Sequence, residues 1–407
     1  MICKTISVGD KRCDSCFKKC DDLKRCSQCS FLYFCNRSCQ ENAWEMHKKE
    51  CKFILKSKPN VPTASMRLFA LILFKLQKYG EDNPQEDIYG RKVSFKTLMS
   101  HAEEIKQSIK PIQQMVALIS TLKDYIGESN IPPPSEFIEI FGKMVINSFT
   151  ISNHDGESIG TGVYLGASVF DHSCNPNAEV VFDGINMYIH AVKRITPRDI
   201  NKVYISYIEQ IEFTEKRQES LLEQYYFLCQ CEKCTSPEYN DLMKKLIVSE
   251  EEAKQHLEKF REGLENIKEI KKSKVGAATL YSACLQELNA QGEILADTHI
   301  YRVKVLETAF DACVWNNQWA DAVMIGQQLL KPYRLYYSDY NPAFGVHLFK
   351  LGKIQLFLNL PSSYETLKQA SEILEITHGK KHPLYQELLE NLCDSESLSL
   401  SKLSITE

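Results

Sequence analysis

The stretch CDSCFKKCDDLKRCSQCSFLYFCNRSCQENAWEMHKKEC, residues 13–51, decides how the N-terminal part of the chain folds. Its ligand pattern is Cys13-x2-Cys16, Cys26-x2-Cys29, Cys35-x3-Cys39 and His47-x3-Cys51. Eight thiolate or imidazole ligands within 39 residues are enough for two tetrahedral zinc sites. Because the stretch has little apolar periodicity, we expect bound metal rather than a hydrophobic core to fold it.

Composition places the whole chain among ordinary globular proteins. With 407 residues, 43% hydrophobic and 25% charged, it is long enough for two or three domains. The longest apolar run is Leu68 to Phe74, and the first twenty residues lack a hydrophobic leader. We therefore expect a soluble intracellular protein with no membrane segment, in which the 16 cysteines stay reduced and are available to bind metal.

Charge is distributed unevenly along the chain. Residues 1–58 hold 13 Lys/Arg against 7 Asp/Glu, although the whole chain has a formal net charge of −4. This basic end favours acidic partners and is compatible with a weak nucleic-acid contact. A solvated surface on a small zinc module is the simpler alternative.

The middle of the chain changes from helical to strand-like patterns. Apolar residues recur at helical spacing over 65–79 and 95–126, and Pro132-Pro133-Pro134 ends that region. Between 144 and 207, short β-rich runs alternate with Asn-Pro and Asp-Gly turns; these runs are Val145-Ile146, Glu179 to Phe182 and Met187 to Val192. The pattern predicts a small, mostly antiparallel β unit.

After Cys234 the periodicity is helical to the end. Helices are predicted at 238–271, 275–291, 297–316, 318–331, 343–358, 364–377 and 383–394. Paired helices of similar length indicate a tetratricopeptide-like array, although no repeat matches a full consensus.

A third cysteine cluster lies between the β unit and the array. Cys229-x-Cys231-x2-Cys234 offers three thiolates, one fewer than a closed structural site needs. Cys174 can supply the fourth ligand, and it lies in the loop Asp171-His172-Ser173-Cys174-Asn175-Pro176-Asn177. This arrangement resembles the post-SET zinc site of SET-domain lysine methyltransferases.

The first stretch in turn resembles the MYND finger, in which the ligand pairs interleave. The resemblance assigns Cys13, Cys16, Cys35 and Cys39 to one zinc, and Cys26, Cys29, His47 and Cys51 to a second. Cys174, Cys229, Cys231 and Cys234 then hold a third. In that family the finger is chiefly a protein-binding surface.

The order of these motifs is that of the SET and MYND domain-containing protein lysine methyltransferases, and the resemblance covers almost the whole chain. It implies an α+β fold with a MYND finger, a small SET core with a post-SET zinc site, and a helical C-terminal array. The implied boundaries are 1–12 (remnant of an N-terminal SET segment), 13–51 (finger), 52–143 (helical insert), 144–210 (SET core), 211–236 (post-SET region) and 237–407 (array).

The resemblance also implies the residues of an active site. Tyr207 matches the catalytic tyrosine, and Phe149 and Tyr225 match walls of the substrate channel. The cofactor, S-adenosylmethionine, is assigned to His101, Asn147, Asp171, His172, Tyr207 and Phe227.

The implied reaction is transfer of a methyl group to a lysine amine of a histone or another protein. Free lysine has a pKa of about 10.4, so a narrow aromatic channel has to remove water and lower it. Aromatic faces also attract a sulfonium cation. The family further implies a monomer in the cytoplasm and nucleus, with protein partners at the finger and a substrate peptide between core and array.

Two departures from the family keep other hypotheses open. The chain reaches Cys13 too early to contain the family's N-terminal Gly-x-Gly loop, and Asp171 stands where the family has Asn, so an amide donor is replaced by an acceptor. One alternative is a non-catalytic adaptor that binds proteins through its finger and array. Another is an incomplete gene product whose upstream sequence restores the loop.

Overall fold

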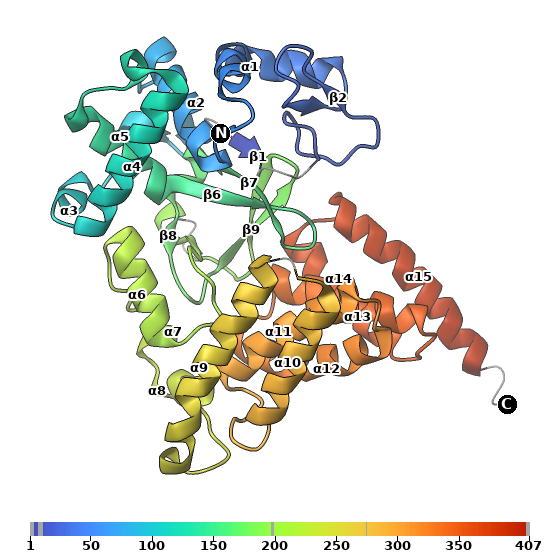
Figure 1. Ribbon diagram of the computed structural model, residues 1–407. Helices are drawn as coiled ribbons and strands as arrows, with labels where there is room; N and C mark the ends of the chain where they lie inside the picture. Colours follow the sequence, from blue (N-terminus) through green and yellow to red (C-terminus); the bar gives the residue numbers. More distant parts are fainter. Residues whose placement is uncertain (1–3, 7–10, 197–198, 274, 404–407) are drawn as a thin grey trace.

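The computed structural model describes residues 4–6, 11–196, 199–273 and 275–403. Figure 1 shows the N-terminal residues and their helices at one end, small sheets in the middle and a bundle of helices at the other end. The predicted α+β class with a helical C-terminal array is confirmed. Of the predicted remnant 1–12, only residues 4–6 and 11–12 lie within the described part, and the array is described as far as residue 403.

The strands form small sheets, as the turn-rich pattern predicts. Three strands pair antiparallel in the order β1 (Lys4–Ile6), β7 (Ser158–Val163), β6 (Ser148–Ser152). The hairpins are β2 (Lys24–Arg25) with β3 (Tyr33–Phe34), β4 (Glu86–Ile88) with β5 (Arg91–Val93), and β9 (Ala178–Asp183) with β10 (Asn186–Ala191). Only one described pair is parallel: β8 (Asp171–His172) with β11 (Tyr204–Ile205).

Helices before the sheets differ from the prediction at two places. They are α1 (Arg37–Ser57), α2 (Ala64–Tyr79), α3 (Ala102–Lys106), α4 (Ile109–Ile126) and α5 (Pro134–Asn147), with short 3-10 turns at Phe95–Thr97, Glu128–Asn130, Leu165–Val169 and Ile200–Lys202. The helix predicted over 95–126 is divided into the 3-10 turn at Phe95–Thr97 and the helices α3 and α4. His101, directly before α3, has a left-handed backbone with φ of 50° and separates the turn from that helix. The 21-residue helix α1 was not anticipated within the finger.

Val145 and Ile146 were predicted to form a strand, and this was wrong. Both belong to α5. The three prolines were expected only to end the preceding helical region, but α5 begins at Pro134. Proline suits the first turn of a helix, where its missing N–H has no partner to lose. The buried face of α5 includes Phe137, Phe141 and Met144 at helical spacing, and this packing overrides the β preference of a Val-Ile pair.

The C-terminal half is helical, as predicted. Its helices are α6 (Thr214–Tyr225), α7 (Glu232–Thr235), α8 (Pro237–Met243), α9 (Glu250–Ser273), α10 (Ala277–Gln291), α11 (Ile300–Trp315), α12 (Trp319–Tyr336), α13 (Pro342–Phe357), α14 (Ser363–Thr377) and α15 (Pro383–Leu403). The single helix predicted over 238–271 is two helices, α8 and α9, separated by residues 244–249. None of the described helices combines the length and apolar character needed to span a membrane.

Close packing between α13 and α14 depends on glycines. A Cβ atom placed on Gly345 would lie 2.7 Å from Leu374 Cδ2, and one on Gly352 would lie 2.7 Å from Leu367 Cδ2. Leu367 and Leu374 are fully buried in the core of the array. The two helices therefore approach more closely than larger residues would allow.

The array is joined to the sheets by buried polar contacts. Asn341, just before α13, donates from Nδ2 to Glu179 Oε1 on β9 at 3.1 Å. Lys233, on α7, donates from Nζ to the carbonyl oxygen of Tyr336 at 2.6 Å. Both array residues flank the turn between α12 and α13, so this turn is a docking point for the array.

Candidate active site and metal centres

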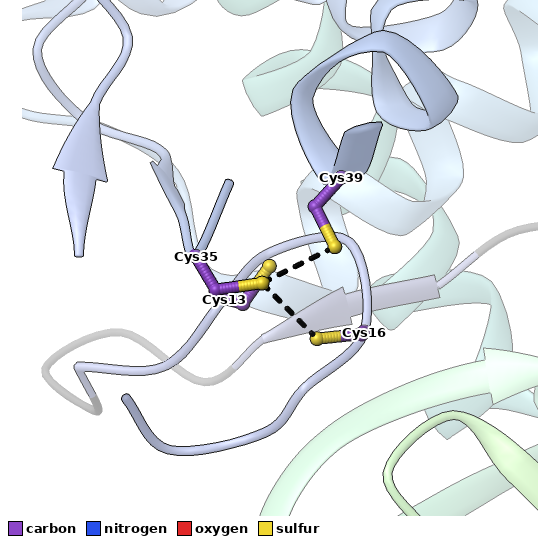
Figure 2. A group of neighbouring side chains, drawn as sticks. All are labelled: Cys13, Cys16, Cys35 and Cys39. Carbon is purple, nitrogen blue, oxygen red and sulfur yellow. Dashed lines mark hydrogen bonds between the residues drawn. The ribbon is translucent and has the colours of Figure 1, made fainter. Parts of the chain in front are cut away.

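The first ligand cluster joins the loop before β2 to the start of α1. Figure 2 shows the four sulfur atoms of Cys13, Cys16, Cys35 and Cys39 pointing toward one another. The Sγ atoms of Cys35 and Cys39 are 3.3 Å apart, and those of Cys16 and Cys35 are 3.9 Å apart. A tetrahedron with zinc–sulfur bonds of about 2.3 Å has edges of roughly 3.8 Å, so the spacing fits a zinc ion.

The second cluster uses one face of α1. His47 and Cys51 lie one helical turn apart, which explains the His-x3-Cys spacing. His47 Nε2 lies 3.3 Å from Cys26 Sγ and 3.6 Å from Cys29 Sγ, and the Sγ atoms of Cys26 and Cys51 are 3.9 Å apart. All four side chains are buried.

The other ring nitrogen of His47 faces a buried ion pair. His47 Nδ1 lies 3.8 Å from Glu50 Oε2. Arg67, on α2, holds Glu50 through Nε–H to Oε1 at 2.7 Å and through a second N–H to Oε2 at 3.2 Å. Glu50 and Arg67 are 1% and 3% exposed, so the finger is attached to α2 through charges that have no access to water.

The third cluster joins the loop after β8 to α7. Cys174 Sγ lies 3.5 Å from Cys234 Sγ and 4.0 Å from Cys229 Sγ, and Cys231 completes the group. Among the described residues, three such groups bring their ligand atoms within 4.8 Å of one another. They are the three sets expected from the sequence, and soft thiolate and imidazole ligands in fours suit zinc.

A cavity of about 870 Å³ opens beside this third cluster. Its lining includes seven of the eight residues expected at the active site: His101, Asn147, Phe149, Asp171, Tyr207, Tyr225 and Phe227. These residues lie on the loop before α3, the junction of α5 and β6, β8, the segment after β11, and the end of α6. The fold therefore gathers positions spread over 127 residues around one space.

Two tyrosines form one aromatic wall of the cavity. The ring centroids of Tyr207 and Tyr225 are 4.8 Å apart. The hydroxyl of Tyr207 donates a hydrogen bond to the carbonyl oxygen of Phe170. Burial, with smaller contributions from Asp171 and Tyr225, raises the pKa of Tyr207 above its usual value. The hydroxyl therefore stays protonated at neutral pH and can orient a polar group, but it does not act as a base.

The eighth residue, His172, lies behind this wall. Its ring is 5.2 Å from that of Tyr207 and 5.9 Å from that of Phe227, and it is not among the described residues that line the cavity. Its Nδ1 accepts the backbone N–H of Tyr207 at 3.0 Å, and its Nε2 lies 3.2 Å from Cys174 Sγ.

Two polar residues of the lining, Asn147 and Asp171, offer acceptors to the cavity. Asn147 is 7% exposed, and its Nδ2 donates hydrogen bonds to the carbonyl oxygens of Met99 and Lys143 at 3.0 and 2.8 Å. Only the side-chain oxygen of Asn147 is therefore left to bind a ligand. The carboxylate of Asp171 is exposed on β8, and His101 packs on Tyr226 with ring centroids 5.0 Å apart.

Some lining residues were not anticipated from the sequence. Arg91 and Lys92 lie on β5 of the β4–β5 hairpin and line the cavity. This hairpin is distant in sequence from strands β6, β8 and β9, which also line it. The Tyr89-Gly90 turn could have predicted the hairpin but not where it packs. The carbonyl oxygen of Phe170, which accepts from the hydroxyl of Tyr207, was also not anticipated, because a backbone acceptor does not depend on residue type.

Comparison with known proteins agrees with this arrangement. Residues 13–51 match the family model described as the MYND finger. The human protein named histone-lysine N-methyltransferase SMYD3 is 32% identical over 391 residues, which cover 94% of this chain and 88% of that protein. The chicken (Gallus gallus) N-lysine methyltransferase SMYD2 is 28% identical over 398 residues, covering 96% of this chain and 89% of that protein.

Proposed function

The chain belongs to the SMYD family of SET and MYND lysine methyltransferases, and we propose that it methylates lysine side chains of proteins with S-adenosylmethionine as methyl donor. The observation that carries the proposal is the single cavity beside Tyr207. Seven residues chosen from separate motifs line it together. We assign Tyr207 as the catalytic residue and Phe149 and Tyr225 as channel walls.

The cavity fits the donor in size and chemistry. Its volume of about 870 Å³ lies within the usual range of roughly 300–1,000 Å³ for small-molecule sites. Asp171 can accept hydrogen bonds from an ammonium group, and Asn147 can offer its carbonyl oxygen. The faces of Tyr207, Tyr225 and Phe227 suit a sulfonium cation and a flat ring. When bound, S-adenosylmethionine supplies an electrophilic methyl carbon.

The residues of the channel prepare the lysine amine. The amine must be neutral, because its nitrogen lone pair would form the new bond to the methyl carbon of a bound donor, with the donor's sulfur as the leaving group. Burial against Phe149 and Tyr225 lowers the pKa of a lysine, so its proton is released to water before attack. The hydroxyl of Tyr207 and the carbonyl of Phe170, already joined by a hydrogen bond, can accept the remaining N–H groups and aim the lone pair.

The peptide that carries the lysine is assigned to the space between the core and the array. A second cavity, of about 480 Å³, is lined by β9, the loop after β6 and helices α11 to α13. Its lining carries the carboxyl groups of Glu209, Glu307 and Asp311 beside the ammonium groups of Lys271 and Lys350, and Lys271 pairs with Asp311 at 2.9 Å. The exposed carboxylate of Glu209 can attract a lysine of the peptide.

Calorimetric titration of S-adenosylmethionine into the zinc-loaded chain tests the proposal. We expect binding that Phe227→Ala weakens by roughly tenfold. Tyr207→Phe should keep binding but lose transfer of tritiated methyl groups to core histones. Phe357→Ala, which removes an exposed phenylalanine of the array, is the matched control. A folded protein with three zinc ions that binds no S-adenosylmethionine would contradict the catalytic proposal and favour the adaptor.

A further inference from the structure

His172 occupies a defined place between two backbone segments. Its strand, β8, pairs in parallel with β11, and His172 lies opposite Ile205. The chain continues through Ser206 to Tyr207, and the N–H of Ser173 donates to the carbonyl of Ile205 at 3.0 Å. The imidazole is thereby held beside the segment that delivers Tyr207 to the cavity.

The hydrogen bonds of the ring determine which nitrogen carries the proton. Nδ1 accepts the N–H of Tyr207 at 3.0 Å, so it has no hydrogen of its own. In a neutral imidazole the proton then lies on Nε2, which is 3.2 Å from Cys174 Sγ. The geometry thus corresponds to an N–H donated to the sulfur of a metal ligand.

The same cluster also fixes a second wall of the cavity. Cys229 follows Phe227 by two residues, so ligation of Cys229 holds the backbone that presents the phenyl ring. The His172 ring fills the space behind Tyr207 and Phe227. Cys174 itself is only 1% exposed.

We propose that His172 is a positioning residue that couples the third metal site to Tyr207. The thiolate of Cys174 fixes the tautomer and orientation of the imidazole, and the imidazole fixes the backbone of Tyr207. Metal bound at the third cluster therefore determines, through His172, where the hydroxyl of Tyr207 lies in the cavity. The inference rests on the proposed role of Tyr207, and it assigns the imidazole of His172 a supporting role in place of a direct side-chain contact with the methyl donor.

Two conservative substitutions test separately the contact of His172 with Cys174 and its hydrogen bond with Tyr207. In His172→Asn, the side-chain oxygen can occupy the place of Nδ1 and accept from Tyr207, but no group reaches Cys174. In His172→Gln, the amide nitrogen can approach the place of Nε2 and donate to Cys174, but the acceptor for Tyr207 is lost. His256→Asn, on the exposed face of α9, is the matched control.

The readouts do not depend on catalysis alone. We expect cadmium-113 NMR of the cadmium-loaded full chain to show one four-sulfur resonance displaced in His172→Asn and retained in His172→Gln. Amide hydrogen exchange at Tyr207 should accelerate in His172→Gln only. For methyl transfer to core histones, kcat should fall by roughly 10–100-fold in both variants, while the Kd for S-adenosylmethionine changes by less than about threefold.

Two results would overturn the proposal. One is a cadmium spectrum that is identical in the wild type and His172→Asn, because the contact with Cys174 would then be absent. The other is a loss of S-adenosylmethionine affinity as large as the loss of kcat, because His172 would then be a ligand of the methyl donor. If the wild type transfers no methyl group, the proposed function fails, while the spectrum and the exchange rate still decide the role of His172.

Discussion

The ammonium group of Lys233 lies 2.6 Å from the carbonyl oxygen of Tyr336, across 103 residues of sequence. Tyr336 is the last residue of α12, where carbonyl groups have no partner within the helix and a cation is favoured. The same ammonium donates to the carbonyl of Gln210 at 3.1 Å, and Lys233 is only 3% exposed. One side chain from the short helix α7 therefore holds two segments together.

Lys233→Met should loosen the array without disturbing the metal. The substitution keeps the aliphatic stem but leaves two buried carbonyl groups without a donor, which costs about 2–3 kcal/mol of unfolding free energy. Denaturant unfolding measures the loss, and faster amide exchange at the end of α12 locates it. Lys331→Met, at an exposed position of the same helix, should change little. Equal effects from the two variants would show that the contact does not stabilise the docked array.

Arg67→Met should weaken the attachment of the finger to α2. It leaves the Glu50 carboxylate buried beside His47 with no cation, and the loss of one partner of a buried pair costs about 3–5 kcal/mol. The double variant with Glu50→Gln should recover part of that loss, because no charge is then left unpaired. Denaturant unfolding with zinc counting checks both outcomes. Arg37→Met, which breaks an exposed pair with Glu41 on α1, should cost under about 0.5 kcal/mol.

Glu307→Gln should remove a pH-dependent loss of unfolding free energy in the array. Burial, followed by the neighbouring Glu209, raises the pKa of Glu307 from 4.5 to about 7, and Tyr333 donates to its Oε1 at 2.8 Å. Asp311 also raises this pKa, whereas Lys304 lowers it. Because the pKa of Glu307 is higher in the folded than in the unfolded state, folding takes up a proton when the pH lies between about 4.5 and 7. The unfolding free energy therefore falls as pH rises from about 4.5 to 7 and stays low above.

The glutamine variant cannot ionise, and its oxygen still accepts from Tyr333. We expect it to match the wild type at pH 4 and to exceed it by about 3 kcal/mol at pH 8. Denaturant unfolding at several pH values gives the difference. Glu372→Gln, at an exposed position of α14, should leave the wild-type profile unchanged. A constant offset between the two proteins at every pH would contradict the assignment.

Gly352→Ala should destabilise the array although alanine favours helices. Its methyl group would lie 2.7 Å from Leu367 Cδ2 and 3.3 Å from the backbone nitrogen of Leu367, so α13 and α14 would have to move apart. Overpacking of this kind costs about 1–3 kcal/mol. Gly292→Ala is the control, because its nearest atom beyond the chain neighbours is at an ordinary 3.4 Å. Thermal unfolding that ranks the two variants in the opposite order would refute the packing argument.

The metal ligands were the part of the molecule that could be predicted best from the sequence. Coordination restricts both residue type and spacing, and the structure groups all twelve ligands into the three expected sets. Long helices such as α2, α13 and α14 were equally predictable, because each is rich in apolar residues at helical spacing that the structure buries. Val145 and Ile146 were not readable, since local β preference competes with the packing of a helix whose partners lie far away in sequence.

The cavity was only partly readable, for a different reason. Family resemblance supplied its residues, but not which way each side chain points. His172 lies on a two-residue strand whose orientation depends on β11 and the third cluster, so its sequence neighbours do not reveal that its ring faces away from the cavity. Arg91 and Lys92 reach the cavity only because a separate hairpin folds against it.

All twelve metal ligands lie before residue 235, whereas the partner of Lys233 lies at Tyr336. During synthesis the ribosome releases the finger and both halves of the third cluster well before α12 emerges. Domains generally fold in the order of their synthesis. The metal sites can therefore be filled on the nascent chain, and the helical array then docks on a surface that is already complete. We therefore expect zinc that binds while the first 234 residues are made to promote docking of the later half.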